Sequence, residues 1–181
     1  MPVKTKKSAL TTTEVAVLGL LHWSPMSGYD LKKAIDSSIG YFWGPAKSQI
    51  YAVLPRLVEA GLATGKKIPQ SQRPDKTVYR LTPAGRAALK AWIEDTPPPP
   101  DPDRNPLLLK IFFGAVSSPE VLVGQVHERR RQAERLRETL QALEAEADPE
   151  DLYPALTRRW GLEYAGAVIR WAKDVERLLG G

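Results

Sequence analysis

The sequence contains no cysteine among its 181 residues. It therefore offers no disulfide, no thiolate nucleophile, no iron–sulfur cluster and no thiolate zinc site. Histidine is scarce as well, with only His22 and His127, and no cluster of carboxylates accompanies either of them. Both are interpreted as structural residues, so the sequence predicts neither a metal site nor a bound cofactor.

Long apolar runs and catalytic patterns are also missing. No run of 18 apolar residues occurs, which predicts no membrane span. The first seven residues are polar and basic and lack the apolar stretch of a signal peptide, so we expect a cytoplasmic protein. The sequence shows no glycine-rich phosphate loop and no Ser/His/Asp arrangement of convincing spacing. It therefore predicts a protein that is not an enzyme.

The charges are distributed unequally along the chain, whose formal net charge is +5. Residues 1–94 hold 14 Lys or Arg against 6 Asp or Glu, whereas residues 95–181 hold 12 against 15. A basic half followed by a mildly acidic one is typical of a phosphate-binding module joined to a protein-binding module. The same charges would also serve solubility alone.

A proline-rich segment separates these halves. Thr96–Pro106 contains six prolines in eleven residues, which excludes a helix or a central strand and favours extended polyproline II. We interpret residues 96–106 as a fairly stiff linker. The expected domains are then residues 8–95 and residues 107–181.

The first domain carries the pattern of a winged helix-turn-helix. Apolar periodicity and capping signals predict three helices, then two strands, then a fourth helix. The predicted ranges are 12–23, 27–39 and 45–60 for the helices, 62–68 and 77–81 for the strands, and a helix that starts at Thr82-Pro83. The fold class is therefore mostly α with a small β-hairpin.

In this fold the third helix enters the major groove of DNA and the hairpin touches the flanking backbone. The side chains predicted to contact DNA are Lys47, Ser48, Gln49, Tyr51 and Arg56 on the helix, and Lys66, Lys67, Arg73 and Lys76 on the hairpin. An ordinary solvated helix face would show similar residues. The alternative function is a winged-helix module that binds an acidic protein without contacting DNA.

The second domain is predicted to be an antiparallel helical hairpin. After a short helix over 107–116, residues 118–148 carry apolar residues at alternating spacings of four and three, which is a coiled-coil seam. A further helix over 150–179 carries its own apolar stripe, and a second copy of the chain is the simplest partner. The predicted dimerisation residues are Leu122, Val126, Leu136, Leu140, Leu143, Trp160, Tyr164 and Trp171.

Three tryptophans have two interpretations. Trp92, Trp160 and Trp171 lie near the expected domain and dimer junctions, where large aromatic residues usually form core. Beside a dimer seam they could also stack on a small planar apolar effector. The sequence leaves both interpretations open.

Several segments together resemble the PadR family of transcriptional regulators. They are Leu18-Gly19-Leu20-Leu21, Ser27-Gly28-Tyr29-Asp30-Leu31, Ser48-Gln49-Ile50-Tyr51, Gly61-Leu62 and Tyr79-Arg80-Leu81-Thr82-Pro83. The helices after Pro106 are similar to the dimerisation domain of that family. The resemblance implies a homodimer with two winged domains, usually a repressor that a small molecule or other signal releases from double-stranded DNA. It also implies that Ser48, Gln49 and Tyr51 lie at the DNA.

Overall fold

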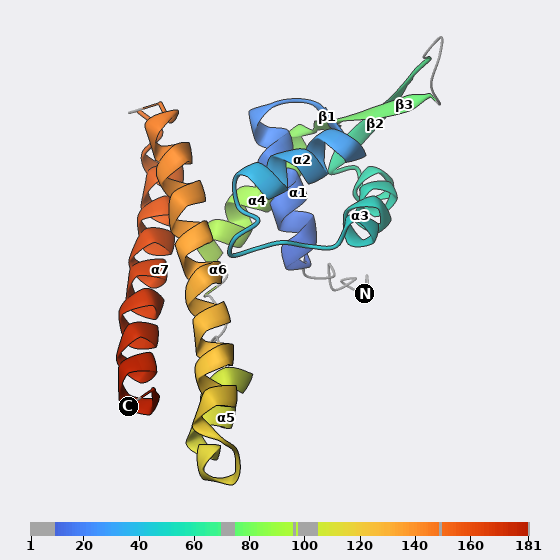
Figure 1. The fold of residues 1–181 in the computed structure, drawn as a ribbon. Coiled ribbons are helices and arrows are strands. Elements are labelled where there is room, and N and C mark those ends of the chain that lie inside the picture. The colour runs from blue at the N-terminus through green and yellow to red at the C-terminus, as the bar shows by residue number, and fades with distance from the viewer. Residues whose placement is uncertain (1–9, 70–74, 96, 98–104, 149, 181) are drawn as a thin grey trace. The chain divides into compact units, whose positions relative to one another are not determined.

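A computed structural model describes residues 10–69, 75–95, 97, 105–148 and 150–180. The chain divides into two compact units, Met1–Pro99 and Pro100–Gly181, which are described separately below (Figure 1). Arg73 and most of the predicted linker, residues 96 and 98–104, lie outside the described residues.

The first unit has the element order of a winged helix. It consists of α1 (Thr12–Trp23), β1 (Met26–Ser27), α2 (Gly28–Ser37), α3 (Lys47–Glu59), β2 (Ala63–Ile68), β3 (Lys76–Leu81) and α4 (Pro83–Asp95). The mostly helical fold class with a small sheet is confirmed.

Two helix starts of this unit are closed by capping boxes. The Thr11 hydroxyl accepts from the amide of Glu14 (3.3 Å), while the Glu14 carboxylate accepts from the Thr11 amide (2.8 Å). Ser27 and Asp30 repeat the arrangement at α2, with distances of 3.3 and 3.0 Å. Each box satisfies amide groups that a helix start would otherwise leave without partners, so the local sequence determines where α1 and α2 begin.

The core of this unit lies between its first three helices and the start of β2. Among the largest side chains, Leu18 of α1, Leu31 and Ile35 of α2, and Ile50 and Leu54 of α3 are fully buried. Their spacings of three and four residues explain why one stripe of each helix turns inward. The opposite stripe of α3 is therefore left in solvent.

The wing is a three-stranded antiparallel sheet in the order β1-β3-β2. The two residues of β1, which the sequence analysis did not predict, pair with β3 through Met26 and Tyr79. Gly61 ends α3 with a positive φ of 70°, and the amide of Leu62 donates back to the carbonyl of Leu57 (2.8 Å). This glycine-dependent helix end turns the chain directly into β2.

The second unit is built on two long helices. It contains α5 (Pro106–Phe112), a short 3-10 helix η1 (Gly114–Val116), α6 (Pro119–Ala145) and α7 (Leu152–Leu179). The last two form an antiparallel hairpin, drawn orange and red in Figure 1. Arg130 of α6 donates to the carboxylate of Glu176 on α7 (3.0 Å), which links the two helices through charge as well as packing.

The structure corrects the predicted dimer seam of α6. Leu122, Val126 and Leu140 are at most 6% exposed in the single chain. Leu122 packs close to Gly114 of η1, and α7 packs along α6. These three side chains form the interior of one protomer, so they are not free to make the dimer contact.

The face of α7 that packs inside the protomer is separate from the stripe predicted to meet a second copy. Gly161, Ala165, Ile169 and Ala172 are buried, whereas Trp160 is 58% and Tyr164 is 40% exposed. Small residues allow two helices to approach closely, so the helix turns its small side chains toward α6 and leaves its large aromatic ones outside. Among the described residues, none of the helices combines the length and the apolar composition of a membrane span.

Candidate nucleic-acid interface

The solvent side of α3 has small side chains along its centre and polar side chains along its edges. Ser48, Ala52 and Pro55, spaced four and three residues apart, are exposed and lie opposite the buried stripe. At about 100° per residue, Lys47 and Tyr51 fall on one edge of this stripe, and Gln49 and Arg56 fall on the other. A helix surface of this shape can approach the floor of a groove while its edges reach sideways. The sequence analysis did not assign Ala52 and Pro55 to this face.

Tyr51 joins α3 to the start of α2. A Cβ atom on Gly28, the first residue of α2, would lie 2.9 Å from two ring carbons of Tyr51, so glycine leaves the space that the ring occupies. The ammonium of Lys47 lies 5.7 Å from the centre of the same ring, within reach of a cation–π attraction. Tyr51 nevertheless remains 45% exposed. This edge of α3 therefore combines a positive charge with an accessible phenol.

Gln49 has a structural role that its sequence position did not reveal. Ala46, the residue before α3, has no side chain that could cap the helix, and the Gln49 carbonyl oxygen accepts from the Ala46 amide instead (2.9 Å). Its amide NH2 group makes no hydrogen bond within the described residues. Gln49 can therefore cap the helix and still offer donors outward.

Arg56, predicted as a DNA contact, is already engaged inside the unit. Its Nε and one terminal nitrogen donate to Oε1 of Glu14 on α1, at 3.2 and 2.6 Å. Pairing across 42 residues cannot be read from local spacing, so the sequence analysis did not foresee this contact. The Arg56 side chain is 54% exposed, and its predicted contact with DNA stays a prediction.

The pairing register of the wing sorts its basic residues onto two faces. Side chains directly opposite in an antiparallel pair share a face, and neighbours along a strand alternate. Lys66 pairs with Val78 and Thr64 with Arg80, so Lys66, Lys76 and Arg80 share one face. Lys67 pairs with Thr77 and lies on the other. Because of this alternation, the exposed Arg80 of β3 lies on the same face as Lys66, and we include it in the candidate site.

Lys76 connects the Lys66 face of the wing to α2. Its ammonium lies 3.4 Å from the carboxylate of Asp30. Hydrogen bonds from the hydroxyl and amide of Ser27, with a smaller contribution from Lys76, hold the pKa of Asp30 below its usual value. The carboxylate therefore stays charged at neutral pH. Lys76 therefore links this face of the wing to the first turn of α2, on which Tyr51 packs.

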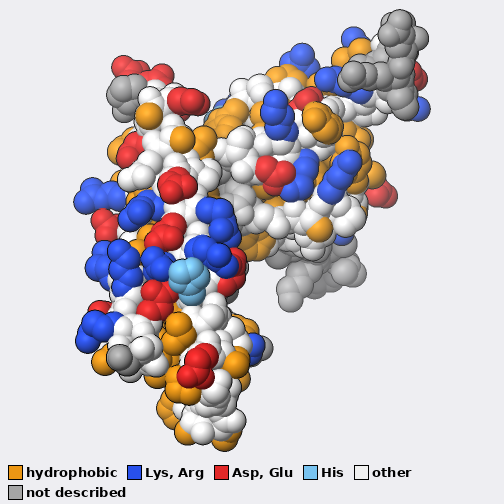
Figure 2. Space-filling model, viewed as in Figure 1, with side chains coloured by type: hydrophobic (Ala, Val, Ile, Leu, Met, Phe, Trp, Pro, Cys, Tyr) orange, Lys and Arg blue, Asp and Glu red, His pale blue; other side chains and the backbone are white. Residues whose placement is uncertain are grey.

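Charge differs in pattern between the two units. Figure 2 shows basic and acidic side chains close together along the helical hairpin, where Arg131 pairs with Glu128 and Arg130 with Glu134. Among the predicted DNA contacts that the structure describes, only Arg56 and Lys76 have an acidic partner among the described residues. Lys47, Ser48, Lys66 and Lys67 are all exposed. Among the described residues no group of His, Asp and Glu side chains that could hold a metal ion occurs.

Three helices, a hairpin wing and an exposed polar face on the third helix define the class of winged helix-turn-helix proteins. Residues 17–91 match the family model described as "Transcriptional regulator PadR-like family". Residues 104–180 match the model described as "Virulence activator alpha C-term". The chain belongs to the PadR-like family of transcriptional regulators.

Individual relatives agree with this assignment. The chain is 30% identical over 138 residues to the "Negative transcriptional regulator PadR" of Bacillus subtilis, covering 74% of this chain and 76% of the relative. It is 30% identical over 180 residues to the "Probable transcriptional regulator Rv1176c" of Mycobacterium tuberculosis, covering 91% and 95%.

Solved structures show the same fold. Bacillus subtilis PadR in complex with operator DNA has a TM-score of 0.81 at 24% identity, over 93% of this chain and 99% of that one. The same relative in complex with p-coumaric acid has a TM-score of 0.74 at 25% identity, over 96% and 99%.

Proposed function

We propose that this protein is a homodimeric repressor that binds double-stranded DNA sequence-specifically and releases it when a small molecule binds. The exposed face of α3, small along its centre and polar at both edges, is the observation that carries the proposal. It has the shape and the donors of a helix that enters the major groove, and Lys66, Lys76 and Arg80 supply cations beside it. No catalytic step forms part of this function.

The two kinds of contact have different roles. Gln49 presents an amide NH2 group, which can donate to an acceptor on a base edge, so we assign it to base reading. Lys66 and Arg80 present cations at the wing, where the neighbouring phosphates would lie, so we assign them to backbone contact. Lys47, Ser48 and Tyr51 lie at the start of α3 and can meet either group.

A dimer would place two such helices on one face of the duplex. Half-sites one turn apart are separated by about 34 Å, so the operator should be a near-palindrome of that spacing. A signal that changes the separation of the two helices would weaken binding without touching either of them.

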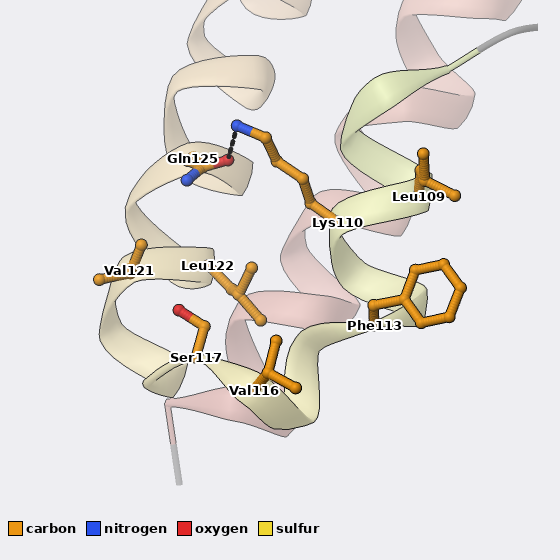
Figure 3. A pocket seen from close by; sticks show the side chains of 8 residues that line it. All are labelled: Leu109, Lys110, Phe113, Val116, Ser117, Val121, Leu122 and Gln125. Atoms are coloured by element: carbon orange, nitrogen blue, oxygen red, sulfur yellow. Dashed lines mark hydrogen bonds between the residues drawn. The ribbon is translucent and has the colours of Figure 1, made fainter.

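We propose that a second copy covers apolar surface on the helical unit. Several large side chains of α5 and η1 are exposed there, namely Leu108, Leu109, Phe112, Phe113 and Val116, the last to 92%. Beside them lies a hollow of about 340 Å³ between α5, η1 and the start of α6 (Figure 3). Apolar side chains such as Val121 and Leu122 line it, and Lys110 donates to Gln125 at its rim (3.0 Å). Apolar surface of this extent marks an interface.

Selection of bound sequences from a random duplex pool tests the proposed function directly. We expect an enriched near-palindrome, and affinity for it that survives an excess of competitor DNA. A basic module that binds an acidic protein instead would enrich no sequence and would lose all binding to the competitor.

Base reading and phosphate contact are separable by mutation. Gln49→Ala should weaken binding to the selected duplex by about 1 to 3 kcal/mol and should change binding to random duplexes little. Lys66→Gln should weaken binding to selected and random duplexes alike. It should also reduce the slope of log affinity against log salt concentration by about one unit. Affinities of both duplexes at several salt concentrations check the two outcomes.

Lys67→Gln is the matched control, because Lys67 is the next residue on the opposite face of the wing. It should reduce the salt slope less than Lys66→Gln does. Loss of the Gln49 cap also lowers the stability of α3, which weakens binding to every duplex equally. This effect therefore cancels in the ratio of the two affinities. The assignment is wrong if Gln49→Ala leaves that ratio unchanged.

Effector binding is proposed at tryptophans, namely Trp92 of the winged unit and Trp160 and Trp171 of the helical unit, each taken within its own unit. Trp92 and Trp171 are half-buried, and Trp160 stacks on Tyr164 with ring centres 5.5 Å apart. Because a relative has been solved with p-coumaric acid, this planar acid is a suitable probe. It should quench tryptophan emission and lower affinity for the selected duplex. If a panel of planar aromatic acids does neither, sensing through these tryptophans is excluded.

A further inference from the structure

One buried carboxylate connects the first and third helices of the winged unit. Glu14 is 8% exposed, and its two oxygens have different partners. Oε2 accepts from the amide and hydroxyl of Thr11, at 2.8 and 2.9 Å, and so caps α1. Oε1 accepts from two nitrogens of Arg56 in the last turn of α3, at 3.2 and 2.6 Å. The same group therefore closes one helix and holds another.

The chemistry of this contact makes it rigid. Burial by itself would raise the pKa of Glu14, but hydrogen bonds from Arg56 and Thr11 outweigh burial and lower it. The carboxylate is therefore charged at neutral pH and needs its partner, because an unpaired charge at a buried position is strongly unfavourable. The guanidinium is planar and directs its donors in fixed directions, which a lysine ammonium does not do.

The position of Arg56 on α3 gives this contact a consequence at the DNA side. Arg56 follows Gln49 by seven residues, or nearly two full turns, so both side chains lie on the same edge of the helix. Holding that edge against α1 fixes the rotation of α3 about its own axis. The direction in which Gln49 points is fixed by the same contact.

We infer that Arg56 is a positioning residue rather than a phosphate contact: the Glu14–Arg56 ion pair sets the rotation of the reading helix and with it sequence discrimination. The inference rests on the proposed DNA binding. It differs from the sequence-based assignment of Arg56, which would place its guanidinium on the DNA backbone.

The test compares three variants, Arg56→Gln, Glu14→Gln and the double variant, on selected and random duplexes at several salt concentrations. Each single variant should reduce the ratio of the two affinities about tenfold, which is the worth of one well-aligned base contact. The double variant should lose no more than either single one, because both remove the same contact. The salt slope should stay at the wild-type value, in contrast to Lys66→Gln.

Arg56→Lys keeps the positive charge and perturbs folding least, so it decides the question even if the glutamine variants melt at low temperature. A phosphate contact would tolerate lysine, whereas a positioning contact should still lose discrimination. The inference is overturned if Arg56→Lys binds as the wild type does, or if Arg56→Gln flattens the salt slope by about one unit while Glu14→Gln has no effect.

Two further results separate this inference from the proposed function. Equal losses on both duplexes, with thermal melting lowered, would show that the ion pair only stabilises the fold and would overturn the inference alone. Failure of the wild-type protein to enrich any sequence would overturn DNA reading itself, and this inference with it.

Discussion

Replacing Gly85 with alanine is expected to unfold much of the winged-helix unit at moderate temperature. A Cβ atom at Gly85 would lie 2.0 Å from the carbonyl oxygen of Leu62 and 2.8 Å from a methyl group of Leu81. The first of these neighbours is backbone and cannot rotate away, so α4 has to move. The movement would strain two hydrogen bonds. In one the Thr82 hydroxyl donates to the Gly61 carbonyl (2.7 Å), and in the other the Thr82 amide donates to the Leu62 carbonyl (3.1 Å).

We expect Gly85→Ala to cost about 3 kcal/mol, as overpacking together with weakened hydrogen bonds would. Thermal unfolding followed by circular dichroism measures it. Gly19→Ala is the matched control, because Gly19 lies inside α1 with nothing within 4 Å of its Cβ position. Alanine is the better helix former by roughly 0.8 to 1 kcal/mol, so this variant should melt at or above the wild-type temperature. Equal melting of the two variants would contradict the role assigned to Gly85.

Helix starts of the winged unit could be predicted because their signals are local. Thr11 with Glu14, and Ser27 with Asp30, carry the whole capping interaction within four residues. The strand β1 could not be predicted in this way, since two residues show no periodicity and become a strand only by pairing with Tyr79 and Val78. Local patterns thus located the elements, while pairing between distant segments completed the sheet.

The candidate site was predicted in part for the same reason. The exposed start of α3, with Lys47, Ser48, Gln49 and Tyr51, follows from the helical period. What each polar group already binds does not follow from it. Gln49 caps its own helix and Arg56 binds Glu14, and only coordinates reveal that these groups are engaged.

Burial divides the predicted dimer residues of the helical unit into two groups, one inside the protomer and one on its surface. The stripe predicted to meet a second copy includes Trp160 and Tyr164, and the single chain leaves both of them exposed. Packing favours the stripe with Gly161 and Ala165, because its small side chains let α6 approach. The large aromatic residues remain outside, where a second protomer can reach them.

This rearrangement predicts opposite behaviour for two residues that the sequence assigned to one interface. Leu140 has no exposed surface, so Leu140→Ala should lower the free energy of unfolding by about 2 to 5 kcal/mol through lost burial and a cavity. Trp160 is mostly exposed in the single chain, so Trp160→Ala should leave protomer packing nearly intact. It should instead weaken dimerisation by about 2 kcal/mol, as the loss of an aromatic anchor does.

Sedimentation and thermal melting over a range of protein concentrations distinguish the two effects. The dimer contributes to stability by mass action, so the melting temperature of Trp160→Ala should approach that of the wild type at high concentration. The deficit of Leu140→Ala should persist at every concentration, because its cavity lies inside each protomer. Lys173→Ala is the control, because Lys173 is exposed on the same helix but lies away from the face that carries Trp160, and it should alter neither property. Dissociation by Leu140→Ala without loss of protomer stability would return this leucine to the dimer interface, and unchanged dimerisation of Trp160→Ala would exclude Trp160 from it.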